Sequence, residues 1–338
     1  MKKLLLLLFT LTTGCLLEGT KDVTSRYLDA VKVGDVIEYK NLRIFPLIAQ
    51  EKLSNQHYVT LDEAVDKGWL KMKEVGTGQI DFVEMKNTGP KLVYIMTGEV
   101  ISGANQDRMT KEDVLLDATS DWIRVPVYCV EHGRWSSVTS AFQSARVLVP
   151  NAVRQRAKMT ESQTDVWDEI AHSQDELGIA SETGTVRSNY KDASVQHTVD
   201  EYTRAFKAVP TLSPLTVGVV VTTGNRIICC DLFAHNKLLK KLWNKLIQSY
   251  VMDALHSERG TVTKHTVEEF LTHLKCVRYV SAGTPGAGQL FNTESSYGKG
   301  SALIYDATLV HMDFFPIISS IKDPPIRLDF RRDQRMDN

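Results

Sequence analysis

The sequence has no excess of either charge and none of the residue spacings that typify a metal site. Lys and Arg number 40 against 41 Asp and Glu, which leaves a formal net charge of −1. A chain without a positive surplus is unsuited to coating the phosphates of nucleic acid. The five cysteines form no Cys-x-x-Cys pair, and the nine histidines show no His-x-x-x-His spacing. We therefore predict no nucleic-acid partner and no metal site.

Internal repeats are missing as well, and long apolar runs are scarce. No segment recurs at a fixed period, which excludes solenoids and propellers. The most apolar segment extends from Leu4 to Leu11 and contains one polar residue, Thr10. A transmembrane helix needs about 20 apolar residues. This run is too short to be one, so we expect any attachment to a membrane to use a lipid.

The first 15 residues are arranged like a bacterial lipoprotein signal peptide. Two lysines precede the apolar run, and a glycine directly precedes Cys15. Leu11 lies one residue further from Cys15 than is usual in such signals. We predict that residues 1–14 are cleaved off, that Cys15 carries the lipid in the cell envelope, and that residues 15–40 form a linker. The alternative is a buried N-terminal strand or helix.

The composition is that of a globular protein, and its first half has the pattern of β-structure. Apolar residues make up 43% of the chain and charged residues 24%, which is enough for a sizeable core. One helix is expected from Thr60 to Gly68, because Thr60 and Glu63 have capping-box spacing and Gly68 can end it. The strands expected in this half are residues 42–48, 80–85, 92–96 and 123–130.

The second half combines helical periodicity with a β-hairpin. Helical apolar faces recur in residues 160–171, 195–206, 236–256 and 266–274. The hairpin strands are residues 215–221 and 226–232, and later strands are expected at 277–281, 301–307 and 309–315. We predict an α+β fold with a mostly β first half, followed by helices and a β-hairpin. It should form a single domain over residues 41–322, with two interlocked lobes and a solvated tail over 323–338.

Three further segments are expected at the surface without a chemical role. Gly178–Lys191 is rich in Ser, Thr and Gly and is predicted to be a mobile loop. Lys237, Lys241 and Lys245 are spaced by four on the long helix, opposite its apolar face, and are predicted to be solvated. The Gly-rich segment Ser281–Gly288 lacks the Lys-Ser/Thr of a phosphate-binding loop, so we predict an ordinary loop.

Two segments in the first half carry an unusual set of polar residues. Residues 97–108 read Thr-Gly-Glu-Val-Ile-Ser-Gly-Ala-Asn-Gln-Asp-Arg, with an amide, an acid and a guanidinium on consecutive positions. Residues 125–135 read Val-Pro-Val-Tyr-Cys-Val-Glu-His-Gly-Arg-Trp. Strand alternation would place Cys129 and Glu131 on one face. That carboxylate would raise the pKa of the Cys129 thiol, which argues against a nucleophile.

These segments resemble an uncharacterised prokaryotic family named for its association with ADP-ribosylglycohydrolase and rhodanese-phosphatase proteins. The family patterns are Gly-Glu-x-x-x-Gly-Ala-x-Gln-Asn-Arg and Val-x-Cys-x-Glu-x-Gly-Arg-Trp. The chain departs from them only at Asp107, where asparagine is usual. The resemblance extends from about Leu42 to Leu255. It implies a link to ADP-ribose or to phosphorylated metabolites, but no particular reaction and no cofactor.

Two functions follow as alternatives. The chain is either an envelope lipoprotein that binds or acts on a phosphorylated or ADP-ribose-like ligand, or a non-catalytic structural or interaction lipoprotein whose Glu and Arg residues brace the fold. In the first case the acids are Glu99 and Glu131, and the ligand contacts are Gln106, Arg108, Arg134 and Trp135. Convergence of these side chains on a cleft would favour a ligand site. Mutual pairing in a sealed interior would favour the brace.

The remaining cysteines and the isolated histidines are expected to be structural. Adjacent strand residues point to opposite faces, so Cys229 and Cys230 are poorly placed to bond each other. We predict free, buried thiols. Isolated histidines are more often hydrogen-bonded structural residues than ligands, and we predict this for His172, His197 and His311.

Overall fold

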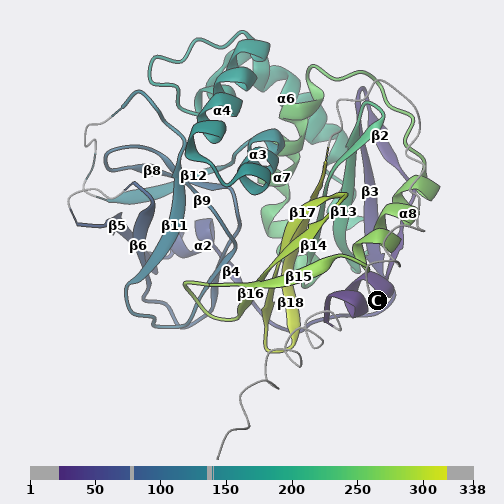
Figure 1. Cartoon of the computed structure of the whole chain (residues 1–338), viewed down its shortest axis with the longest axis horizontal. Coiled ribbons are helices and arrows are strands. Elements are labelled where there is room, and N and C mark those ends of the chain that lie inside the picture. Colours follow the sequence, from purple (N-terminus) through teal and green to yellow (C-terminus); the bar gives the residue numbers. More distant parts are fainter. Residues whose placement is uncertain (1–22, 77–79, 135–138, 140, 318–338) are drawn as a thin grey trace, which may run out of the picture.

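The structure, a computed structural model, has the predicted α+β architecture. Two β-rich lobes lie side by side, and the main helices lie over and between them (Figure 1). The described residues are 23–76, 80–134, 139 and 141–317. The predicted signal peptide, Cys15, Trp135 and the tail over 323–338 lie outside them.

The larger lobe is built on a nine-stranded sheet whose neighbouring strands pair antiparallel. The predicted hairpin is confirmed and forms its centre. In spatial order the strands are β1 (Val31–Val33), β3 (Leu42–Ala49), β13 (Thr216–Thr223), β14 (Arg226–Phe233), β18 (Thr308–Pro316), β17 (Gly298–Tyr305), β16 (Gln289–Ser295) and β15 (Arg278–Ala282), with β2 (Ile37–Tyr39) paired to β3.

Each face of this sheet buries its own core. Successive side chains of a strand point to opposite faces. Ile44 therefore packs into one core and Phe45 into the other. Cys229 and Cys230 are divided in the same way, and both are free and buried, as predicted.

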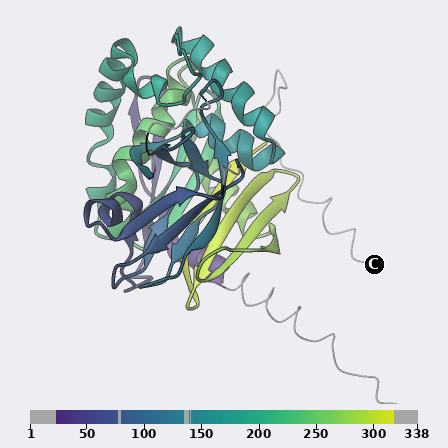
Figure 2. The same ribbon diagram turned by 90° about the vertical axis from the view of Figure 1, so that its left-hand side faces the viewer.

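The smaller lobe contains two further sheets and one short helix, seen in front in Figure 2. The helix α2 (Leu61–Asp66) starts at Thr60, and the predicted capping box between Thr60 and Glu63 is present. The six-stranded sheet has the order β12 (Phe142–Leu148), β8 (Glu99–Gly103), β9 (Arg108–Thr110), β11 (Ile123–Cys129), β6 (Phe82–Asn87) and β5 (Leu70–Glu74). The three-stranded sheet has the order β10 (Val114–Leu116), β7 (Val93–Ile95) and β4 (Val59–Thr60).

Helices cover both faces of the large sheet and connect the lobes. The predicted long helix is confirmed as α7, and its apolar residues fill the core shared with α6. The helix α8 packs against the opposite face (Figure 1). The helices are α3 (Asn151–Thr160), α4 (Gln163–Leu177), α5 (Ser188–Lys191), α6 (Ala193–Phe206), α7 (Asn236–Ala254) and α8 (Lys264–Leu274), with the 3-10 turn η1 (Val209–Thr211).

The folded body begins earlier than the predicted linker allows. Residues 23–30 are helical and lead directly into β1 and β2, which pair with β3. Tyr27 and Leu28 are buried in the core beneath β3. The short apolar stretches of this segment are buried against the large sheet. The sequence of the segment by itself gives no sign of this packing.

Several elements were not predicted, among them helix α3 and strand β16. Helix α3 buries Arg154 and Lys158 beside few apolar residues, so it lacks the apolar periodicity by which helices are recognised. Strand β16 follows the glycine-rich segment and has a mixed polar sequence. Both elements matter, because they form walls of the pocket described below. Within the part of the chain that the structure describes, no helix is long and apolar enough to cross a membrane.

Candidate functional site

The structure separates Glu99 from the other predicted site residues. Its side chain is fully buried and accepts hydrogen bonds from the Lys245 ammonium at 2.6 Å and the Met96 amide at 2.9 Å. The same ammonium lies 2.7 Å from Asp62. Burial raises the pKa of Glu99, and Lys245 opposes that rise. Glu99 therefore forms an internal ion pair between β8 and α7.

The prediction that Lys245 is solvated is wrong. The residue is at the edge of the apolar face of α7, and its side chain is only 6% exposed. The small lobe covers this edge and supplies both carboxylates. The other two lysines of the stripe, Lys237 and Lys241, are exposed as predicted.

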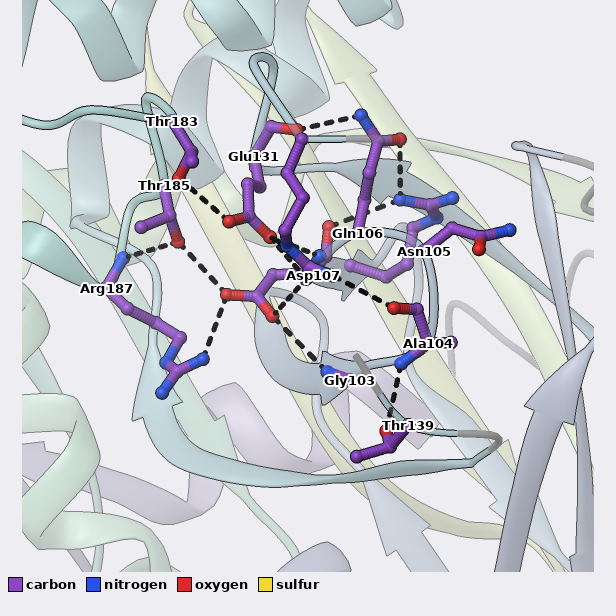
Figure 3. A network of polar contacts seen from close by, with 12 residues as sticks. Gly103, Ala104, Asn105, Gln106, Asp107, Glu131, Thr139, Thr183, Thr185 and Arg187 are labelled. Carbon is purple, nitrogen blue, oxygen red and sulfur yellow. Dashed lines mark hydrogen bonds and ion pairs between the residues drawn. The ribbon is translucent and has the colours of Figure 1, made fainter. Parts of the chain in front are cut away.

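Glu131 and Arg134 form the centre of a second polar network (Figure 3). Arg134 donates to one carboxylate oxygen of Glu131 from Nε at 2.9 Å and from Nη2 at 2.6 Å. The Asp107 amide and the Thr183 hydroxyl also donate to this carboxylate, at 3.0 and 2.8 Å. Burial raises the pKa of Glu131, but these donors outweigh it, so the pKa lies below its ordinary value. A carboxylate so held is a stable anion and a poor proton donor.

Asp107, the residue that departs from the family pattern, is the second anion of this network. Its carboxylate accepts from the Thr185 hydroxyl at 3.0 Å and from Arg187 at 3.2 Å, and it lies 3.5 Å from Arg134. Figure 3 shows Asp107, Glu131, Thr185 and Arg187 pointing toward one another from the turn before β9, from just after β11 and from residues 183–187. The segment predicted as a mobile loop thus supplies three partners. Its Ser, Thr and Gly content typifies loops and gave no sign of that docking.

Gln106 and Arg108 are sealed beneath the same network. The Gln106 amide donates to the Glu131 carbonyl at 2.9 Å, and its oxygen accepts from Arg108 at 3.0 Å. Arg108 is fully buried, and its Nε and Nη2 have no hydrogen-bond partner in the described part of the chain. Cys129 is buried beside it, and burial raises the pKa of this thiol, which makes it a poor nucleophile.

The Glu131–Arg134 motif therefore has the geometry of a brace. Side-chain exposure is 6% for Glu131, 1% for Asp107 and 14% for Arg134, and the Arg134 guanidinium pairs with both carboxylates. The network links three segments that are far apart in the sequence. The carboxylates of this network have their partners within it, so they fix positions and offer little to a ligand, whereas two nitrogens of the buried Arg108 have no partner in the described part of the chain.

A pocket of about 240 Å³ lies elsewhere, between the two lobes. We call it the interlobe pocket. Its walls come from the turn between β9 and β10, from β11, from α3 and its C-terminal end, and from β16 and β17. Its charged residues are three lysines and two glutamates, namely Lys111, Lys158, Lys299, Glu112 and Glu161.

The three pocket lysines differ in how closely a carboxylate lies to their ammonium groups. Lys158 lies 2.6 Å from Glu112, and Lys299 lies 3.9 Å from Glu161. The Lys111 ammonium lies 4.2 Å from the centre of the Tyr128 ring, and no carboxylate of a described residue pairs with it. Burial would lower the pKa of Lys158, but the Glu112 carboxylate keeps it above its ordinary value. All three lysine side chains thus line one small space.

The pocket is joined to a buried cluster of charges between the lobes. Glu112 faces the pocket, and the next residue, Asp113, points into the cluster with Arg154, Asp231 and His311. All four of these side chains are at most 3% exposed. The prediction that His311 is a structural, hydrogen-bonded histidine is confirmed. The cluster ties α3, which is one wall of the pocket, to β14 and β18.

The described residues contain other features that could be considered as functional sites. A shallower hollow of about 580 Å³ lies at the surface around His57, Lys91 and Asp117. Among the described residues, no group of three or more His, Cys, Asp or Glu side chains is placed to hold a metal ion. Cys276 is a free, exposed thiol.

Comparison with known proteins gives one match. A family model described as the ARG and Rhodanese-Phosphatase-superfamily-associated Protein domain matches residues 30–315. This range includes the brace, the interlobe pocket and strands β1 to β17. No curated protein and no solved structure matches the chain.

Proposed function

The chain belongs to the ARG and Rhodanese-Phosphatase-superfamily-associated Protein domain family, and on that premise we propose that it binds a small phosphorylated molecule in the interlobe pocket. The observation that carries the proposal is the convergence of Lys111, Lys158 and Lys299 from three separate segments on one cavity. Lysine ammonium groups bind phosphate as compact point charges. Lys111, which has no carboxylate partner among the described residues, is the cation available to an incoming anion.

The volume of the pocket favours a small ligand over a complete ADP-ribose. Pockets that enclose drug-sized ligands have volumes of roughly 300–1,000 Å³. The interlobe pocket, at about 240 Å³, is below that range. A dinucleotide-sized molecule would enter only in part. Of the two ligand classes that the sequence suggests, the pocket supports a phosphorylated small molecule.

Binding is supported more than catalysis. Both pocket glutamates lie beside a lysine, at 2.6 Å for Glu112 and 3.9 Å for Glu161. Carboxylates paired in this way orient a ligand and balance the lysines. The sealed Glu131 network likewise supports the non-catalytic alternative for that motif, because its acids already have their partners. We therefore propose that the motif stabilises the fold and that the ligand binds in the interlobe pocket.

We also propose that the protein is lipid-anchored in the cell envelope. The support is the sequence of its first 15 residues, in which two lysines and a leucine-rich run lead to Gly14 and Cys15. The helix at residues 23–30 packs on the large sheet, so few residues separate Cys15 from the folded body.

A thermal-shift screen of the purified protein tests the binding proposal. The compounds are inorganic phosphate, ribose 5-phosphate, AMP and ADP-ribose. A ligand at 100 times its Kd adds about 2.7 kcal/mol to the free energy of unfolding, which raises Tm by several degrees. Lys111→Met should remove that rise, whereas Lys240→Met, an exposed lysine of α7, should keep it. The proposal fails if no compound shifts Tm, or if Lys111→Met responds like the unaltered protein.

A further inference from the structure

We infer that the ligand of the interlobe pocket is a phosphorylated sugar or polyol, and not a nucleotide. The inference rests on the proposed function, because it identifies the part of the ligand that is not phosphate. Three features of the pocket carry it: a cation covers its aromatic ring, one of its hydrogen-bond acceptors has no donor, and its charges alternate in sign.

The aromatic ring of the pocket is already covered by a cation. Tyr128 is the aromatic residue among those that line the pocket, and the Lys111 ammonium lies 4.2 Å from its ring centre. A nucleobase is commonly held by stacking on an aromatic face. To stack on this face, a base would have to displace Lys111, the lysine best placed to receive the phosphate. A base and a phosphate would thus compete for the same place.

The pocket wall contains a hydrogen-bond acceptor that lacks a donor. The Asn292 amide oxygen is buried and has no hydrogen-bond partner among the described residues. Asn292 lines the pocket on β16, whereas the side chain of the next residue, Thr293, points to the other face of the sheet. Buried polar atoms are normally paired, so an unpaired acceptor beside a cavity indicates a donor that the ligand brings. Hydroxyl groups supply such donors.

The charges of the pocket alternate in sign around a small space. Lys158 pairs with Glu112 on one side, and Lys299 lies near Glu161 on another. A sugar hydroxyl can donate to a carboxylate and accept from an ammonium at once, because it has one donor and two acceptor lone pairs. A compact molecule with one phosphate and several hydroxyls therefore matches every polar group described here. A planar base matches fewer of them.

The glycine at the end of the pocket keeps its floor in place. Gly300 pairs with Thr293 across β16 and β17. A Cβ atom at Gly300 would lie 2.1 Å from the Asp313 carbonyl oxygen and 2.9 Å from the Thr293 hydroxyl, which leaves no room for a side chain. At Gly300 this wall of the pocket is therefore packed backbone to backbone against the neighbouring strand.

Calorimetric titration of the full chain with ribose 5-phosphate, ribose, AMP and inorganic phosphate tests the inference. We expect ribose 5-phosphate to bind at least tenfold more tightly than AMP or phosphate, and ribose to bind weakly. Asn292→Leu removes the unpaired acceptor, so it should weaken ribose 5-phosphate at least fivefold while leaving the Kd of phosphate unchanged. Lys111→Met should weaken both ligands.

The outcomes separate the two proposals. Tighter binding of AMP than of ribose 5-phosphate, lost in Lys111→Met, would leave the proposed function standing and overturn the sugar assignment. Absence of binding by all the phosphorylated compounds would overturn both. If Asn292→Leu does not fold, the unaltered protein can instead be titrated with 2-deoxyribose 5-phosphate and glycerol 3-phosphate, which have fewer hydroxyl groups than ribose 5-phosphate. Affinity that does not fall as hydroxyls are removed from the ligand would contradict the inference.

Discussion

The Asp113 carboxylate and the His311 imidazole, 198 positions apart, meet at 2.7 Å in the wall between the two lobes. The other ring nitrogen of His311 lies 3.2 Å from Asp231. Asp231 in turn accepts from Arg154 at 2.7 Å. Burial alone would lower the pKa of His311, but the two carboxylates outweigh it and raise it from 6.5 to about 9. The imidazole is therefore a cation at neutral pH.

This pair predicts a loss of stability at alkaline pH. The folded-state pKa of His311 lies above its unfolded value, so the stabilisation is fully present below pH 6.5 and disappears as the pH rises to about 9. A pKa shift of this size corresponds to a contribution of at most about 3 kcal/mol to the free energy of unfolding. Urea unfolding between pH 6 and 9.5 should show this decline. In His311→Gln the decline should be absent, and in His172→Gln, an exposed control, it should persist. Equal slopes in all three proteins would contradict the assignment.

The pair between Glu99 and Lys245 predicts strong coupling between the lobes. Lys245→Met leaves the buried Glu99 carboxylate without its cation, which should cost about 3–5 kcal/mol of unfolding free energy. Adding Glu99→Gln to that variant removes the uncompensated charge, so the double variant should regain a large part of the loss. Lys240→Met, on the exposed side of the same helix, should change stability by less than about 0.5 kcal/mol. Additive losses in the double variant would show that the two residues do not interact.

The brace predicts that Arg134 acts on stability and not on the ligand. Lysine keeps the charge of arginine but loses the fork that holds Glu131 by two hydrogen bonds. Arg134→Lys should therefore lower the unfolding free energy by about 1–2 kcal/mol and leave the Kd for ribose 5-phosphate unchanged. The matched control is Arg146→Lys, because Arg146 is 57% exposed and pairs with an exposed Asp66. That change should be nearly neutral. A stable Arg134→Lys protein with weakened binding would return the motif to the ligand site.

The signal-peptide proposal predicts where the protein is found in cells. Cys15→Ser should prevent lipidation, so the protein should leave the membrane fraction or accumulate as uncleaved precursor. Cys276→Ser, which alters the exposed thiol of the folded body, should remain with the membranes. Fractionation followed by detergent phase partitioning measures both variants. Recovery of unaltered protein and Cys15→Ser alike in the soluble fraction would contradict lipid anchoring.

Local signals in the sequence were sufficient for much of the fold. The capping box at Thr60, the β-hairpin over residues 216–233 and the apolar face of α7 are patterns set by neighbours a few residues apart. Such patterns depend on backbone geometry that any chain obeys, and they predicted the α+β class correctly. Helix α3 was missed because its buried face carries Arg154 and Lys158, whose burial depends on carboxylates supplied by other elements.

The placement of charge was decided by tertiary structure. Glu99 and Glu131 were predicted to act together, yet they have separate partners. Lys245 from α7 donates to the Glu99 carboxylate, whereas Arg134 and Thr183 donate to the Glu131 carboxylate. The sequence alone determined the family, the fold class and the lipoprotein-like first 15 residues, because short-range patterns carry these. Only the tertiary structure decided that the motif is sealed and that the pocket lies between the lobes. A charge is stabilised in the interior by whichever partner the fold brings within about 3 Å, and that partner is distant in the chain.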